Sequence, residues 1–194
     1  MELTNIRIGL GITGSFCTFS KLFSVIETLK NEGATVLPIM SQNAYTTDTR
    51  FGNINEIKEK IENLTNNKII ATIPEAEPIG PKNLIDIMFI YPCTGNTIAK
   101  LANAITDTPV LMATKSHLRN QKPVLIGIST NDGLGANAKN IGNLLNTKNI
   151  FFVPFGQDDY IKKPNSLVCD NEKITTAIKN ALEFRQVQPI LTGD

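Results

Sequence analysis

The chain of 194 residues falls in the size range of one domain, so residues 1–194 are expected to form a single unit with its own core. Hydrophobic residues make up 41% and charged residues 19%, and no apolar stretch has the length that crosses a bilayer, so a membrane protein is not expected. Lys and Arg number 19 against 18 Asp and Glu, and this net charge of +1 without basic blocks argues against nucleic acid as a partner.

The start of the chain and its cysteines indicate a protein of the cytoplasm. Residues 1–5 lack the basic start, apolar middle and cleavage site of a secretory signal. Cys17, Cys93 and Cys169 are widely separated and form no C-x-x-C pair, so free thiols are expected rather than disulfides or zinc. His117 is the only histidine, which excludes a metal site built on several histidines, and no metal is expected.

The first half of the chain alternates apolar runs with helix-forming segments. We expect strands at residues 6–12 and 34–40 and helices at residues 16–31 and 55–63. Residues 66–82 contain three prolines and are expected to form an irregular connection, with a short strand at residues 69–73 as an option.

The second half continues the alternation. The most apolar run, residues 84–91, is expected to be a central strand that Pro92 ends. Further strands are expected at residues 109–113, 124–129 and 150–153, and helices at residues 95–104, 134–145 and 172–185. This alternation predicts an α/β fold of three layers, a doubly wound parallel sheet of the Rossmann or flavodoxin-like kind. Such sheets bind ligands beyond the carboxyl ends of their strands.

The loop after the first strand has the composition of a phosphate site. Gly9, Gly11 and Gly14 fit the spacing G-x-G-x-x-G, and Ser15 adds a hydroxyl at the expected helix start. Free N–H groups and the helix dipole favour an anion at such a place. The alternative is a tight turn into a helix capped by Thr13 or Ser15.

The end of the second strand decides which nucleotide is favoured. A nicotinamide dinucleotide normally requires an acidic residue there to hold the ribose, but this chain has Met40-Ser41-Gln42-Asn43. The absence of that acid favours the phosphate of a mononucleotide.

A second polar loop, Tyr91-Pro92-Cys93-Thr94-Gly95-Asn96-Thr97, follows the central strand directly. It places small hydroxyl and amide groups at another helix start on the same sheet edge, so the two loops are expected to share one ligand. The alternative is a simple helix cap by Thr94. For Cys93, a buried thiol is favoured over a nucleophile.

Cations follow the expected strand at residues 109–113. Lys115, Arg119 and Lys122 would then lie near the site and receive the carboxylates of an acidic substrate, with solvated side chains as the equally weighted alternative. His117 is expected at the surface. The polar segments 131–135, 156–159 and 162–166 are interpreted as turns first and ligand loops second.

Thr13-Gly14-Ser15 and Pro92-Cys93-Thr94-Gly95-Asn96-Thr97 resemble the two cofactor loops of the FMN-binding, cysteine decarboxylase-like flavoproteins. Over nearly its whole length the chain is similar to one branch of that family, the B subunits of dipicolinate synthases. The segments that carry this likeness are residues 49–52, 76–82, 101–104, 149–159 and 163–166. The family's Pro-x-Met-Asn substrate segment is replaced here by residues 114–117, which argues against decarboxylation.

The resemblance implies a flavoprotein fold and FMN as cofactor. The residues that it assigns to the cofactor are Gly11, Thr13, Gly14, Ser15, Ser41, Asn43, Pro92, Thr94, Gly95, Asn96, Thr97 and Ala113. It also implies a subunit that, with an A subunit carrying NADP, oxidises dihydrodipicolinate to dipicolinate in the mother cell of a sporulating bacterium, and a homo-oligomer. Arg50, Lys115 and Arg119 are the candidates for the carboxylates of this dicarboxylate substrate. Two alternatives stay open: a scaffold subunit with an empty pocket, and an FMN-dependent decarboxylase that acts alone.

Overall fold

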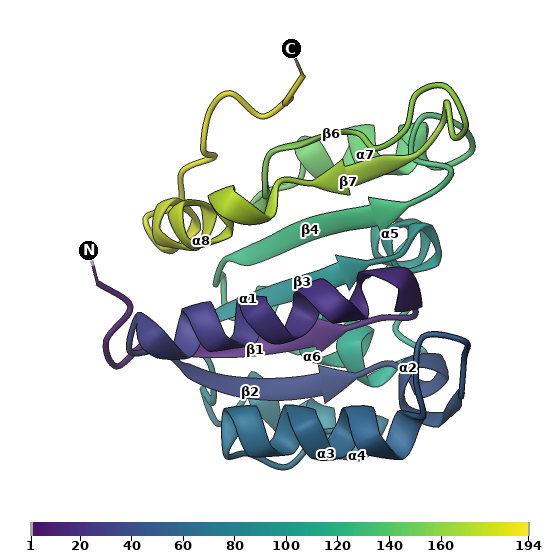
Figure 1. Ribbon diagram of the computed structural model, residues 1–194. Helices are drawn as coiled ribbons and strands as arrows, with labels where there is room; N and C mark the ends of the chain where they lie inside the picture. Colours follow the sequence, from purple (N-terminus) through teal and green to yellow (C-terminus); the bar gives the residue numbers. More distant parts are fainter. Residues whose placement is uncertain (1, 194) are drawn as a thin grey trace.

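A seven-stranded sheet forms the centre of the molecule in the computed structural model, which describes residues 2–193 (Figure 1). The strands are β1 Arg7–Ile12, β2 Thr35–Met40, β3 Ile87–Cys93, β4 Val124–Thr130, β5 Ile150–Phe152, β6 Phe155–Gln157 and β7 Leu167–Cys169. Their order is β2-β1-β3-β4-β7-β6, and β5 pairs with the first half of β4. The pairings among β1 to β5 are parallel, whereas β7 runs antiparallel to both β4 and β6.

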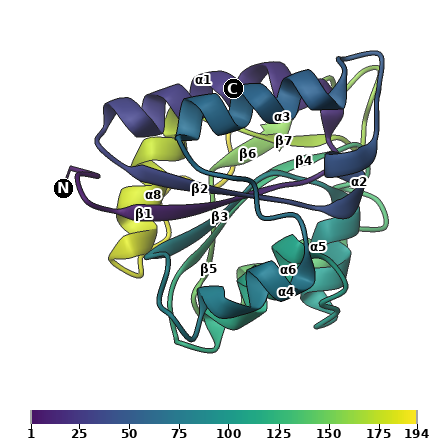
Figure 2. The same ribbon diagram turned by 90° about the horizontal axis from the view of Figure 1, so that it is seen from below.

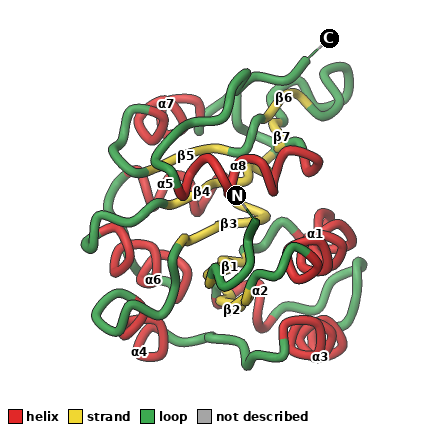
Figure 3. The backbone as a smooth tube through the Cα atoms, turned by 90° about the vertical axis from the view of Figure 1, so that its left-hand side faces the viewer, coloured by secondary structure: helices red, strands yellow, loops and turns green. Residues whose placement is uncertain are grey.

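Helices cover both faces of this sheet, which gives the three expected layers (Figures 2 and 3). The α-helices are α1 Phe19–Asn31, α2 Gln42–Thr46, α3 Ile54–Thr65, α4 Ile73–Ala76, α5 Gly95–Ala102, α6 Pro109–Leu118, α7 Ala138–Leu145 and α8 Ile174–Leu182, and the short 3-10 helices are η1 Phe16–Thr18, η2 Glu77–Ile79 and η3 Asn171–Lys173. Helices α1, α3 and α8 lie on one face, and α4 to α7 lie on the other. The doubly wound α/β fold is therefore confirmed. Within residues 2–193, no helix combines the length and apolar character needed to cross a membrane.

The core lies between the sheet and these helices. All residues of β3 are buried, as expected for a central strand covered on both faces. Gly9 and Gly11 lie inside β1, where an added Cβ at Gly9 would approach Ile85 to 2.5 Å and one at Gly11 would approach Met88 to 2.7 Å. These two glycines therefore allow close packing of the strand and belong to no phosphate loop.

Several expectations about the elements were wrong. Residues 109–113 begin helix α6 instead of forming a strand. Pro92 does not end β3, which continues to Cys93. Residues 69–73 contribute only an isolated bridge between Ile39 and Ile70, because Ile73 already begins α4. The antiparallel pair β6 and β7 was not expected, and α7 begins at Ala138 rather than near residue 134.

Candidate functional site

The loop after β1 and the loop after β3 lie side by side at the carboxyl edge of the sheet, joined through Thr13 (Figure 1). The Oγ1 of Thr13 donates to the carbonyl of Pro92 at 2.6 Å and accepts from the N–H of Thr94 at 3.0 Å. Thr13 is buried, so both hydrogen bonds are shielded from water. One side chain thus fixes the spacing between the two loops that the sequence motifs indicated.

The start of α5 leaves donors available at this edge. The Oγ1 of Thr94 caps the helix by accepting from the N–H of Thr97 at 3.3 Å. Within residues 2–193, the backbone N–H groups of Gly14 and Asn96 donate to no protein atom. An unpaired N–H group at a helix start is a donor for an anionic ligand. Thr94 therefore caps the helix, and donors beside it are left free.

These loops line a cavity of about 380 Å³, which we call the α5 pocket. Its lining residues are Thr13, Gly14, Phe16, Ser41, Gln42, Asn43, Thr94, Asn96, Thr97, Lys100, Asp107, Thr108 and Leu111. The single cation among them, Lys100, is paired with Asp107 at 2.7 Å. The pocket therefore offers mainly neutral hydroxyl, amide and N–H groups.

A second cavity of about 500 Å³, which we call the hairpin pocket, adjoins the first. It is lined by Gly14, Ser15, Cys17, Thr18, Lys21, Thr94, Ser129, Thr130, Asn131, Asp132, Asp158, Lys163, Ser166 and Val168. Gly14 and Thr94 line both cavities. The two pockets therefore form one site that extends along the sheet edge, on either side of these two residues.

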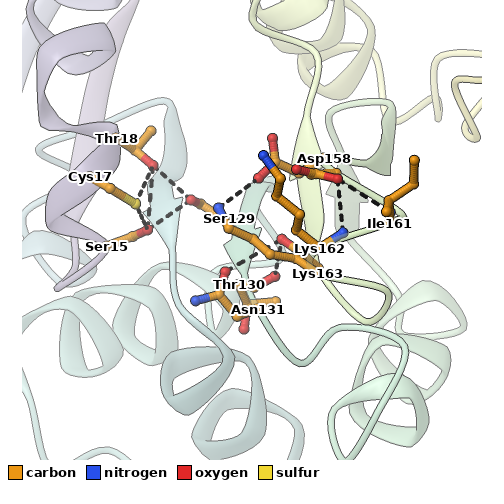
Figure 4. Close-up of polar contacts among 12 residues, drawn as sticks. Ser15, Cys17, Thr18, Ser129, Thr130, Asn131, Asp158, Ile161, Lys162 and Lys163 are labelled. Atoms are coloured by element: carbon orange, nitrogen blue, oxygen red, sulfur yellow. Dashed lines mark hydrogen bonds and ion pairs between the residues drawn. The ribbon is translucent and has the colours of Figure 1, made fainter.

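Three hydroxyl groups meet in the hairpin pocket (Figure 4). The Oγ of Ser129, at the end of β4, lies 2.8 Å from the Oγ of Ser15 and 2.8 Å from the Oγ1 of Thr18, and the last two oxygens lie 3.4 Å apart. This contact holds the start of η1 and α1 against the sheet edge. Ser129 is buried, while Ser15 and Thr18 are half-buried and border the cavity.

A hydrogen-bonded cluster around Asp132 lies between the starts of α5 and α7 and borders the hairpin pocket. Asp132 accepts from the hydroxyl of Thr130 at 2.5 Å and from the side-chain amide of Asn137 at 2.8 Å. An added Cβ at Gly95 would lie 2.5 Å from the carboxylate of Asp132. Gly95 is therefore required for packing against this cluster, and it lines neither cavity.

The connection between β6 and β7 forms the outer wall of the hairpin pocket (Figure 4). Lys163 pairs with Asp158 at 3.1 Å, and both side chains are exposed to solvent. Ser166, at the end of this connection, is buried and donates to the carbonyl of Thr130 at 3.3 Å. Gly156 and Gln157 belong to strand β6, so the turn expected at residues 156–159 was wrong for these two residues. Residues 162–166 form turns, and Asp158, Lys163 and Ser166 contribute to the pocket wall.

The structure brings most of the predicted cofactor residues together. The predicted residues that line one or both pockets are Thr13, Gly14, Ser15, Ser41, Asn43, Thr94, Asn96 and Thr97. Pro92 contributes its carbonyl as the acceptor for Thr13. Gly11 and Ala113 are buried in the core and line neither pocket. Arg50 is exposed in the loop after α2, over the ring of Phe51, and also lines neither pocket.

The predicted positions of Lys115 and Arg119 near the site were wrong. They lie at the last turn of α6, whereas it is the first turn, with Thr108 and Leu111, that borders the α5 pocket. The error followed from the strand expected at residues 109–113, since a helix of this length carries its last turn to the opposite edge of the sheet. There His117, which is buried rather than exposed, hydrogen-bonds to the carbonyl of Pro123, just before β4. Lys122 is at that edge too, 3.8 Å from Asp86.

Cys93 is a buried thiol, in accordance with the favoured interpretation. It is fully buried, and burial raises its pKa well above the ordinary value. A thiol of this kind is a poor nucleophile at neutral pH.

Several pocket residues were not predicted from the sequence. Ser129 and Thr130 follow an apolar run directly, as the Thr13 loop does, and this shared position was the signal that could have identified them. Asp132 lies in the segment 131–135, which was interpreted as a turn first and a ligand loop second. Thr18 and Lys21 fall at a helix start with no distinguishing pattern. Asp107 and Thr108 precede a segment that was assigned to the wrong element.

Comparison with known proteins identifies the class to which this fold and site belong. The sequence model of the family described as Flavoprotein matches residues 1–184, so the chain belongs to this family. Among individual proteins, it is 54% identical over 185 residues to the dipicolinate synthase B subunit of Bacillus subtilis (strain 168), which covers 95% of this chain and 92% of that protein. The resemblance indicated by the sequence motifs is therefore confirmed.

Solved structures agree with this assignment. The crystal structure of the dipicolinate synthase B subunit from Bacillus halodurans C has a TM-score of 0.91 and 47% identity, and covers 100% of both chains. That of the FMN-dependent cysteine decarboxylase SpaF has a TM-score of 0.68 at 20% identity, and covers 93% of this chain and 97% of that one. The second likeness shows the fold alone.

Proposed function

We propose that the chain binds FMN along the sheet edge and acts with a separate A subunit, which carries NADP, in the oxidation of dihydrodipicolinate to dipicolinate. The observation that carries this proposal is the junction of the two helix-start loops through Thr13, with the unpaired N–H groups of Gly14 and Asn96 beside it. Membership of the flavoprotein family and the likeness to dipicolinate synthase B subunits support the choice of cofactor and reaction.

The α5 pocket suits a phosphate monoester. Gly14, Asn96 and Thr97 offer donors there, and Ser41 and Thr94 add hydroxyl groups. Lys100 neutralises the carboxylate of Asp107, so the pocket carries no excess negative charge that would repel an anion. Dipoles and charge-assisted hydrogen bonds of this kind are the usual means of holding phosphate at helix starts.

The path from the α5 pocket to the hairpin pocket suits the rest of the cofactor. A Cβ added at Gly14 would meet only the ring of Phe16, at 3.5 Å, so the glycine leaves space open on the cavity side. Two adjoining cavities of about 380 and 500 Å³ fall in the size range of cofactor sites. Bound there, FMN would supply a ring able to accept a hydride, while the chain supplies orientation and charge.

The same likeness supports a proposal for the biological setting. We place the subunit in the cytoplasm of the mother cell during sporulation, with the A subunit as partner and several copies of this chain in the assembly. Arg50, which lies on the loop after α2, stays a candidate for substrate contact.

Titration with FMN tests the proposal directly. The purified chain should bind FMN with quenching of flavin fluorescence, and Gly14→Val should weaken binding at least about tenfold because its methyl groups enter the space between the two pockets. Asn96→Leu should weaken binding as well, since an apolar side chain replaces a polar one at the pocket wall.

Two matched variants control for general damage. An added Cβ at Gly142 on α7 meets nothing within 4 Å, and Asn143 is exposed on the same helix, so Gly142→Val and Asn143→Leu should bind FMN like the original chain. Equal FMN affinity for Gly14→Val and Gly142→Val, or no binding by any of the folded proteins, would contradict the proposal.

A further inference from the structure

The hairpin pocket contains a cation that the cofactor proposal does not use. Lys21 lies in the first turn of α1, three residues after Thr18 and four after Cys17, which belong to the preceding η1. All three line the pocket, and within residues 2–193 Lys21 forms no ion pair. A lysine in such a position is available to bind an anionic group of a ligand.

The positive charge of Lys21 also affects a residue of the sheet, Cys169. Burial raises the pKa of the Cys169 thiol to about 12, and the nearby Lys21 ammonium opposes this rise. Cys169 lies in β7, and its neighbour Val168 lines the cavity. Lys21 and Val168 therefore border the same cavity, one from α1 and the other from β7.

The hydroxyl cluster adds a neutral donor beside this cation. Ser15, Thr18 and Ser129 carry three hydroxyl protons, and the two contacts of 2.8 Å use two of them. The third proton has only the weak contact of 3.4 Å between Ser15 and Thr18 as an alternative within the cluster. An oxygen anion in the pocket would accept that hydrogen bond.

A second cation stands on the outer wall, on a different element. Lys163 belongs to the connection between β6 and β7 and is paired with Asp158 at 3.1 Å. Both side chains are about half exposed, at 51% and 41%, and such pairs contribute little to stability. Lys163 can therefore exchange Asp158 for a carboxylate of a ligand at small cost.

We propose that the hairpin pocket binds a small aromatic dicarboxylate, with Lys21 and the hydroxyl cluster binding one carboxylate and Lys163 binding the other. Two cations that line one cavity from different elements suit a ligand with two anionic groups on a rigid ring. The nature of the ligand as a pyridine dicarboxylate rests on the proposed function. Lys21 and Lys163 thus replace Lys115 and Arg119 as the residues that receive the substrate's carboxylates.

Calorimetric titration with pyridine-2,6-dicarboxylate tests this assignment, with and without FMN. Lys21→Met should weaken binding of the dicarboxylate about tenfold or more, because a charge-assisted hydrogen bond is lost. Lys163→Met should weaken it less, since Lys163 gives up Asp158 on binding. Pyridine-2-carboxylate, with one anionic group, should bind through Lys21 alone, so its affinity should fall in Lys21→Met and stay unchanged in Lys163→Met.

The control is Lys30→Met, which removes a lysine from the last turn of the same helix, away from the pocket. Lys30→Met should bind both the dicarboxylate and FMN, the latter followed by flavin fluorescence, like the original chain. Dicarboxylate affinity that depends on Lys21 would support the assignment even if FMN failed to bind. Equal dicarboxylate affinity in Lys21→Met and Lys30→Met, or no dicarboxylate binding by the original chain, would overturn it.

Discussion

Single residues fix the positions of the two loops of the site relative to each other. Thr13 connects the loops after β1 and β3 with two buried hydrogen bonds, and removing its hydroxyl would leave the carbonyl of Pro92 and the N–H of Thr94 unpaired. Gly95 performs a different task, since its missing side chain lets the start of α5 contact the Asp132 cluster. Gly95 is thus required for packing, although its place in the polar loop after β3 suggested contact with a ligand.

Gly95→Ala should therefore destabilise the protein by about 1–3 kcal/mol. The added methyl group would lie 2.5 Å from the carboxylate of Asp132 and 2.6 Å from the amide of Asn137, so this hydrogen-bonded cluster must move. Unfolding in urea, followed by circular dichroism, measures the change.

Gly142→Ala is the matched control, because Gly142 lies inside α7 with open space around it. Alanine is favoured over glycine in a helix interior, so this variant should be about 0.5–1 kcal/mol more stable than the original chain. If Gly95→Ala were as stable as Gly142→Ala, the packing role of Gly95 would be refuted.

At the scale of the element, α6 shows where prediction from pattern fails. Its first residues, Pro109 to Ala113, form an apolar run that favoured a buried strand, but Thr108 caps the helix by accepting from the N–H of Leu111, and Pro109 occupies the first turn. A capping threonine followed by proline is typical of a helix start. The helix is buried on most sides, with seven of its ten residues buried and three of those seven polar, so no amphipathic periodicity is visible in its sequence.

The longer strands and helices were predicted well, because their length and hydrophobic periodicity distinguish a helix from a strand. Strands β1 to β4 and helices α1, α3, α5 and α8 lie within a few residues of the expected ranges. The pair β6 and β7 was missed because each strand has three residues, too few for an alternating pattern to emerge. Their partner strands are set by tertiary packing rather than by local sequence.

The buried histidine of α6 makes stability depend on pH. Burial lowers the pKa of His117 to about 4, whereas in the unfolded chain it should be near the ordinary value of about 6.5. Above pH 6.5 both states hold a neutral imidazole, and as the pH falls toward 4 only the unfolded chain takes up the proton. The free energy of unfolding should therefore fall by roughly 2 kcal/mol between pH 7 and pH 5.

His117→Gln tests this origin. Glutamine keeps a donor for the carbonyl of Pro123 but does not titrate, and no other histidine is present in the chain. Urea unfolding at both pH values should show a much smaller difference for the variant. The same loss of stability in both proteins would assign the pH dependence to other groups.

At the scale of the whole molecule, the parallel strands bring separate loops to one edge. The sequence indicated the loops after β1 and β3, and the structure places Thr13, Gly14, Thr94 and Asn96 together as expected. The sequence indicated segments 131–135, 156–159 and 162–166 as ligand loops only in second place. It did not show that they meet in the hairpin pocket, whose wall depends on the turn of the chain after β6. Long-range antiparallel pairing of short strands leaves little trace in the local sequence.

A flavin held at this edge of the sheet should take part in the oxidation itself. The decisive experiment mixes dihydrodipicolinate, without oxygen, with the FMN-loaded chain and its A subunit while the visible absorption of the flavin and the formation of dipicolinate are recorded. We predict loss of the flavin absorption as dipicolinate forms, and neither change with Gly14→Val. Undiminished formation of dipicolinate by the pair lacking flavin, or by the pair with Gly14→Val, would refute a redox role for the flavin and favour a scaffold role for this chain.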